Sequence, residues 1–403
     1  MFRFLFVLQA FVLLINPKVL LHLQSNAGNI LQKLLIILSG IALMATRPMH
    51  RGVVTLMAAI VALTFVGAVG TDYPGFEWRL YIGGVVSAVA PFILLTAQPD
   101  AKDRHLGLIV FAMLPLLMTV LGGLYQLAGI APLFDANPQT GTRLSGSQGP
   151  AYLAAMCFTG TYAALELAER RHVGYTALLA VNTIILVLAG GRMALAMGFL
   201  VCGIAYLRSF RRFPLLKIFV PIWFIVLGGL LLVSFGEDNL RHLGSTSLSN
   251  RDLIWAALNR HLHAHPWFGV GLGNQQLLVP ASLTGTTGTI AGHNEYLRIA
   301  VELGYPGAIL FFALTLGIFL LVWNSAWVRR DPMFLVCAVA FYIYGLTDNT
   351  FSVPQAYFIL AAASFACQKP VSPGEVPQQN LQIPAHVSTR DKRPPQSYAR
   401  IPS

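Results

Sequence analysis

The stretch SNRDLIWAALNRHLHAHPWFGVGLGN, residues 249–274, followed by GHNEYLRIAVELGYPG, residues 292–307, decides which fold the chain can adopt. It is rich in charged and polar side chains, whereas only 11% of the whole chain is charged. A segment of this kind cannot lie in a lipid core, yet apolar runs flank it on both sides. We therefore expect hydrophobic helices to hold it at the outer mouth of a membrane-embedded site.

Composition points to a membrane protein that crosses the bilayer many times. The chain has 403 residues, 56% of them hydrophobic and 11% charged, whereas a soluble domain carries about 25% charged residues. The net charge of +11 does not indicate nucleic acid, because most Lys and Arg stand in short loops beside apolar runs. The 4 cysteines are far apart and form no CxxC pair, so neither disulfides nor thiolate metal sites are expected.

Apolar runs predict an all-α, polytopic fold. A bilayer core of about 30 Å needs about 20 apolar residues per helix. The first run lacks a clear cleavage site and is interpreted as a retained helix and not a signal peptide. By this criterion the chain contains about twelve transmembrane helices, at residues 4–15, 30–45, 53–69, 80–97, 106–127, 151–167, 175–189, 193–207, 215–235, 306–323, 333–346 and 353–366.

Charge in the connecting loops sets the orientation. Each even-numbered run from the second to the tenth is followed by a basic loop, so the positive-inside rule places both termini in the cytoplasm. The odd-numbered runs lead to polar outer loops, of which residues 236–291 form the largest and are expected to contain amphipathic helices. We expect residues 1–367 to form one transmembrane domain and residues 368–403, rich in Pro, Gln and Arg, to be a disordered cytoplasmic tail.

Three arginines lie on the outer side, where positive charge is not needed for orientation. Arg192, in LAGGRMALA, begins the eighth run, so it binds an anion or extends to lipid headgroups. Arg251 stands in the first turn of an amphipathic helix, beside Ser249 and Asp252 in a capping-box pattern. A guanidinium next to free helix N–H groups favours phosphate, although pairing with Asp252 is the alternative. Arg143 lies in the outer loop before the sixth run.

The histidines of the stretch form two groups. His261, His263 and His265 alternate along a helix, and only His261 and His265 share a face, so interfacial side chains are favoured over a metal site. GVGLGN, which follows them, resembles a nucleotide loop but does not follow a strand, so that match is rejected. His293 precedes a helix, with Asn294 and Glu295 adjacent, and is either a general base or a hydrogen-bonded capping residue.

These motifs together resemble a known family. GGRMALA, then R-x-x-x-W with H-P-x-x-G-x-G-x-G, then H-N-x-Y-L with E-x-G-x-x-G occur in the order found in the O-antigen ligase/polymerase superfamily of bacterial envelope glycan assembly. The resemblance covers the middle and C-terminal half of the chain. A further element, R-L-x-G at Arg143, fits the family, although many members carry Asn where this chain has Ala151.

The resemblance implies an enzyme. It would be a metal-independent, inverting glycosyltransferase without a cofactor, working at the periplasmic face of the bacterial inner membrane, with residues 236–304 forming a periplasmic loop that carries catalytic residues. A ligase would move a glycan from undecaprenyl diphosphate to a sugar hydroxyl of the lipid A core. By resemblance, His293 would be the base, while Arg192 and Arg251 would hold the diphosphate.

The same resemblance implies substrate-binding roles for Arg143, Asn294 and Glu295. The roles of Arg79 and Asp348, both in outer segments, stay open. So do the oligomeric state and the acceptor. An O-antigen polymerase or a protein O-oligosaccharyltransferase is an alternative with the same donor chemistry. A secondary transporter is the alternative from another class, against which stands the lack of paired symmetry between the halves.

Overall fold

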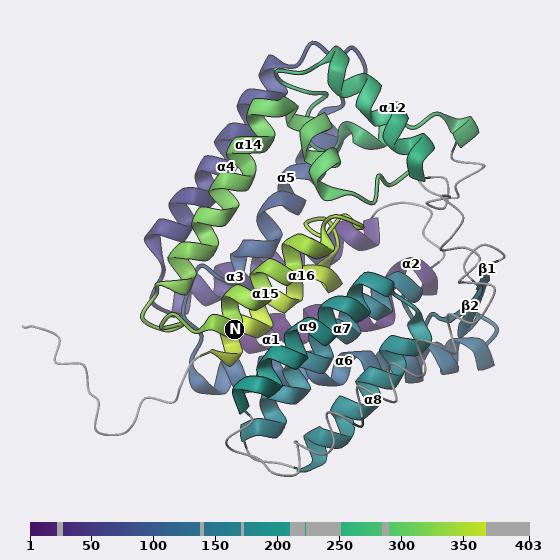
Figure 1. Ribbon diagram of the computed structural model, residues 1–403, viewed down its shortest axis with the longest axis vertical. Helices are drawn as coiled ribbons and strands as arrows, with labels where there is room; N and C mark the ends of the chain where they lie inside the picture. The colour runs from purple at the N-terminus through teal and green to yellow at the C-terminus, as the bar shows by residue number, and fades with distance from the viewer. Residues whose placement is uncertain are drawn as a thin grey trace, which may run out of the picture. The chain divides into compact units, whose positions relative to one another are not determined.

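The structure, a computed structural model, describes residues 1–21, 27–137, 141–170, 173–209, 222, 251–283 and 290–367. In this part of the chain nearly all regular structure is helical, as the apolar runs predicted (Figure 1). The elements in chain order are α1 (Phe2–Ile15), α2 (Pro17–Leu20), α3 (Ala27–Thr46), α4 (Arg51–Gly70), α5 (Trp78–Ile93), α6 (Ala101–Leu127), β1 (Phe134–Asn137), β2 (Gly141–Leu144), α7 (Pro150–Arg170), α8 (Val173–Ala189), α9 (Arg192–Ser209), α12 (Arg251–Ala264), the 3-10 helix η1 (Asn274–Leu278), α14 (Glu295–Trp323), α15 (Pro332–Tyr344) and α16 (Pro354–Ala366).

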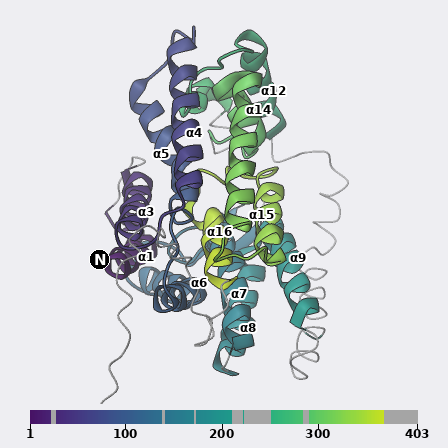
Figure 2. The same cartoon turned by 90° about the vertical axis from the view of Figure 1, so that its left-hand side faces the viewer.

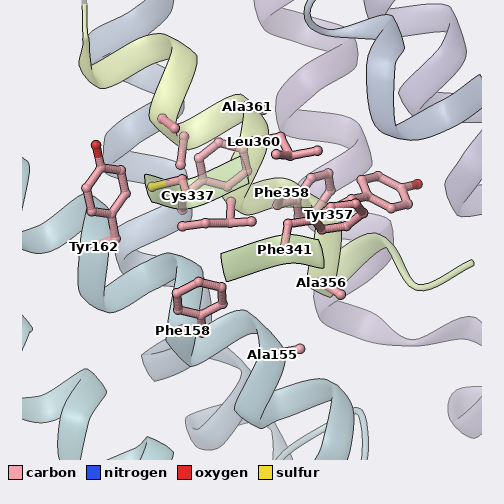
Figure 3. Close-up of a cluster of buried hydrophobic side chains, with 14 of the residues drawn as sticks. Ala155, Phe158, Tyr162, Cys337, Phe341, Ala356, Tyr357, Phe358, Leu360 and Ala361 are labelled. Atoms are coloured by element: carbon pink, nitrogen blue, oxygen red, sulfur yellow. The ribbon is translucent and has the colours of Figure 1, made fainter. Parts of the chain in front are cut away.

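Helix α16 lies at the centre of the hydrophobic core. Every one of its residues is buried, as expected for a helix that is apolar all round. It packs against α6, α7 and α15. Figure 3 shows Phe358 of α16 in the same cluster as Phe341 and Cys337 of α15 and Phe158 of α7.

Helices α4 and α14 lie side by side along their length in both views (Figures 1 and 2). Each keeps large apolar side chains exposed, among them Phe65 and Val66 on α4 and Ile309 and Leu310 on α14. Such extended apolar surfaces are rare on soluble proteins and suit contact with lipid chains. Together with the apolar composition, they make the protein a helical membrane protein.

The helices follow the predicted runs closely. In the described part of the chain three helices, α4, α6 and α14, are long and apolar enough to cross a membrane, and α1, α3, α5, α8, α15 and α16 contain shorter apolar helices. Helices α7 and α9 coincide with the predicted runs 151–167 and 193–207. The run 215–235, apart from Ile222, and the predicted tail 368–403 lie outside the described residues, so the count of about twelve crossings stays a prediction.

Loops that the charge pattern assigns to one side contact one another. At the end expected in the cytoplasm, Arg47 donates to Asp103 at 2.7 Å, and Arg208 pairs with Asp331 at 2.5 Å. At the opposite end, Thr71 Oγ1 donates to the Gly269 carbonyl at 2.7 Å. Arg251 also donates to the Thr347 carbonyl, so the segments 71–79, 251–283 and 347–352 belong to one end of the molecule, where the candidate site lies.

The main departure from the all-α prediction within the described residues is a hairpin in the segment 130–150, which was expected to be a polar outer loop. Strands β1 and β2 pair antiparallel, with Asp135 opposite Arg143. The hairpin ends in Ser145, whose N–H donates to the Leu133 carbonyl at 2.8 Å. It matters for the site because it carries Arg143.

Candidate functional site

His293 projects from the segment that enters α14. Its backbone has φ 45°, a left-handed conformation that non-glycine residues seldom adopt. Its Nδ1 lies 3.5 Å from Oδ1 of Asp348, and both side chains are partly exposed, at 25% and 19%. The next residue, Asn294, caps the helix, because its Oδ1 accepts the Leu297 N–H at 3.0 Å. The Asn294 side chain thus fixes the helix start, a role different from the predicted contact with substrate.

Glu295 does not face the exterior. Its side chain is 1% exposed and pairs with the guanidinium of Arg298, which also donates to Glu302 at 2.6 Å. Arg298 and Glu302 are four residues apart, the spacing at which side chains meet on one face of a helix. The buried position of Glu295, in contrast, does not favour the substrate contact that the family resemblance implied for it.

The loop that follows α15 gathers several of these elements. The Glu295 N–H donates to the Gly345 carbonyl at 2.8 Å, and an Arg251 nitrogen donates to the Thr347 carbonyl at 3.2 Å. Asp348, the next residue, faces His293. This loop therefore brings the starts of α12 and α14 together. The sequence left the role of Asp348 open, and its contact with His293 is what gives it a place in the candidate site.

Helix α12 is amphipathic, as its sequence predicted. It begins at Arg251 and buries one stripe, consisting of Ile254, Ala257, Leu258 and Leu262. The indole N–H of Trp255 donates to the Gly292 carbonyl at 2.6 Å, so the helix is tied to the residue that precedes His293. The predicted capping residue Ser249 lies outside the described residues.

The run GVGLGN supports the first part of α14. The N–H groups of Val270 and Gly271 donate to the carbonyls of Val301 and Glu302 at 3.0 and 2.9 Å. Those two carbonyls have no donor within α14, because the helix is kinked at Gly304, where φ is 71° and ψ is 173°. The loop thus satisfies helix carbonyls, which agrees with the rejection of a nucleotide site.

Three guanidiniums from separate segments act on one another. Arg192 is the first residue of α9, and Arg143 reaches across from β2, where its Nε donates to the Ala189 carbonyl at 3.0 Å. Burial lowers the pKa of Arg143, and Asp135 offsets part of that shift, whereas the charges of Arg192 and Arg251 lower it further.

Arg251 shows the same pattern. Burial lowers its pKa, the carboxylate of Asp348 counteracts this, and the charge of Arg192 lowers the pKa again. Arg143, Arg192 and Arg251, with Asp348 and His293, therefore form one cationic cluster. Like charges gathered in a partly buried site of this kind are stabilised by an anionic ligand.

The other histidines lie apart from this cluster. The rings of His261 and His265 meet the ring of Tyr73, with centroids 6.3 and 5.9 Å apart, and His265 Nδ1 lies 2.5 Å from an Asp72 oxygen. No group of three or more metal-ligating side chains occurs among the described residues. These contacts connect the segment that precedes α5 to α12 and the residues that follow it, and Arg79, in the first turn of α5, is exposed.

The fold and the cluster describe a helical membrane protein with a group of cationic side chains at one end of its helices. Residues 175–312 match the family model described as O-antigen ligase. This match confirms the resemblance and supports the assignment of the chain to the O-antigen ligase family, with a function of the O-antigen ligase or polymerase type. The matched region contains Arg192, Arg251 and His293. No curated protein matches the chain.

Proposed function

We propose that the protein is an O-antigen ligase. It transfers a glycan from undecaprenyl diphosphate to a sugar hydroxyl of the lipid A core, by metal-independent inverting chemistry at the periplasmic face of the bacterial inner membrane, with both termini in the cytoplasm. The observation that carries the proposal is the convergence of Arg143, Arg192 and Arg251 with His293, from segments far apart in the chain.

His293 is the proposed general base. A proton on Nδ1, the ring nitrogen that faces Asp348, would leave the basic lone pair on Nε2 for the acceptor hydroxyl. The deprotonated oxygen attacks the anomeric carbon of the donor as the bond from that carbon to the diphosphate oxygen breaks. The proton is then on His293, where the Asp348 carboxylate stabilises the imidazolium, as in other paired acid–histidine sites. The unusual φ of His293 supports a functional role, because such strain is concentrated at reactive positions.

The arginines stabilise the leaving group in this proposal. The electron pair of the broken bond goes to the diphosphate, whose negative charge grows in the transition state. Fixed guanidiniums from β2, α9 and α12 meet that charge without reorganising. Removal of one such donor costs about 10²–10³ in rate.

The test uses purified protein with a lipid diphosphate-linked glycan and lipid A core. His293→Ala and Arg251→Ala should insert and fold normally but fail to transfer the glycan. The matched controls are His263→Ala and Arg260→Ala, which alter exposed residues of α12 outside the cluster and should keep transfer. Normal transfer by His293→Ala would refute its role as base.

Different acceptors with the same donor separate the related activities. Transfer to lipid A core alone supports the ligase. Elongation of a second lipid-linked repeat would identify a polymerase, and modification of a protein hydroxyl an O-oligosaccharyltransferase. Movement of a solute into liposomes by the His293→Ala protein would instead favour the transporter.

A further inference from the structure

A chain of three charged side chains lies inside the first limb of α14, the turns from Glu295 to the kink at Gly304. Arg298 bridges Glu295 and Glu302, and the side chains of the three residues are 6%, 1% and 2% exposed. We call this group the buried triad. It begins two residues after His293 and is shielded from solvent, so it does not contact a substrate.

The triad is fastened at both ends to the loops that build the site. Glu302 accepts the Gln275 N–H at 3.4 Å through its carboxylate and the Gly271 N–H at 2.9 Å through its carbonyl. At the other end, the Glu295 N–H donates to the Gly345 carbonyl at 2.8 Å, three residues before Asp348. Ion pairs within the triad and backbone hydrogen bonds to Gly271 and Gly345 therefore fix the rotation of this limb about its own axis.

A further cation lies near the triad. Lys33 of α3 is buried, its Nζ donates to Ser87 Oγ at 2.6 Å, and its charge attracts that of Glu295. Ion groups removed from water in this way add little to stability, and apolar replacements of similar volume are often tolerated or stabilising. One oxygen of Glu295 and the Nε of Arg298 have no hydrogen-bond partner. The arrangement is thus poorly explained as a device for stability alone.

We infer that Glu295, Arg298 and Glu302 are positioning residues, which hold the first limb of α14 at the rotation that points His293 toward Asp348. The inference rests on the proposed function, because it assigns the triad a task only if His293 is the base. The triad acts through His293 and makes no contact with the diphosphate, which the arginines of the other segments hold. A small displacement of a reactive group lowers the rate strongly without weakening the binding of substrate elsewhere.

The test removes the charges while keeping the shape of the group. The variant Glu295→Gln/Arg298→Met/Glu302→Gln is compared with Arg298→Lys, which keeps one cation. A matched control, Arg208→Gln, breaks an ion pair at the opposite end of the molecule. Thermal unfolding, kcat, KM for the lipid-linked donor and the pH dependence of transfer are measured for each protein.

We expect the neutral variant to unfold near the wild-type temperature, with kcat lowered about 10²-fold and KM for the donor within about twofold of wild type. The pH dependence of transfer should change, because the contact between His293 and Asp348 is altered. Arg298→Lys should recover part of kcat, and Arg208→Gln should match wild type.

Two outcomes overturn the inference. One is a neutral variant with wild-type kcat. The other is a neutral variant whose activity falls only in proportion to the unfolded fraction, with the pH dependence unchanged, since that result shows a structural role. Failure of the proposed function has a different signature, because His293→Ala would then transfer glycan normally.

Discussion

Gly304→Ala tests whether the kink in α14 requires glycine. At φ 71° and ψ 173° the backbone is in a region that only glycine occupies readily, which costs another residue about 1–3 kcal/mol. An added Cβ would also lie 2.4 Å from the Trp267 carbonyl oxygen and 2.7 Å from that of Pro266. Both obstacles are backbone atoms, so neither can move without displacing the segment that supports the kink.

The two effects together lower the free energy of unfolding by about 2–6 kcal/mol, taking about 1–3 kcal/mol for the overlap. That is a large share of the total stability of about 5–15 kcal/mol. The Tyr305 N–H, which donates to the Pro266 carbonyl at 2.8 Å, should lose its partner as the segments separate. The measurement is thermal unfolding in detergent followed by tryptophan fluorescence, because Trp267 lies at the contact.

Gly83→Ala is the matched control. This glycine lies in α5, and a Cβ there would meet nothing within 4 Å. Alanine should be neutral or raise stability by about 0.5–1 kcal/mol. If Gly304→Ala unfolds at or above the wild-type temperature while Gly83→Ala behaves as expected, the kink does not depend on glycine and the reasoning is refuted.

Three further predictions concern charge. Arg251→Lys should lower transfer about 10²-fold, because an ammonium cannot reproduce the planar fork of donors; an unchanged rate would show that only charge matters. Asp348→Asn should lower kcat at least about tenfold with little change in KM, because the imidazolium loses its counter-charge; wild-type kcat would remove Asp348 from the mechanism. Burial tends to raise the pKa of Asp100, but the Asp103 N–H and the Arg47 guanidinium outweigh it and the pKa is lowered. The ionised Asp100 carboxylate therefore stabilises the fold fully above about pH 4, its pKa in the unfolded chain, and this stabilisation is lost as pH falls through its lower pKa in the folded protein. Asp100→Asn should therefore lose less stability than wild type over that acid range, as measured by acid unfolding.

The helices could be predicted because lipid imposes a simple rule on the sequence. The run 53–69 corresponds to α4, Arg51–Gly70, and the run 306–323 ends where α14 ends, at Trp323. An apolar segment of sufficient length must satisfy its backbone internally, so hydropathy alone locates it. The buried stripe of α12 was predictable for a related reason, since its apolar spacing matches the helical period.

The hairpin could not be predicted in the same way. The segment 134–144 has no clear alternation of apolar and polar residues, and its strands are four residues each. Glu295 is a second case. Its place beside His293 suggested that the Glu295 side chain is exposed. The rotation of the helix start, however, decides which side chain turns inward, and the contacts of Glu295 with Gly345 and Arg298 set that rotation. Such contacts join distant segments and leave no local pattern.

The glycine run that supports α14 has a consequence for motif searches. In a nucleotide loop, closely spaced glycines let successive amides approach the oxygens of a phosphate. Here Val270 and Gly271 offer the same amides to carbonyl oxygens of the chain itself, about thirty residues further on. In this chain the closely spaced glycines therefore bring amides to backbone carbonyls that precede the helix break at Gly304.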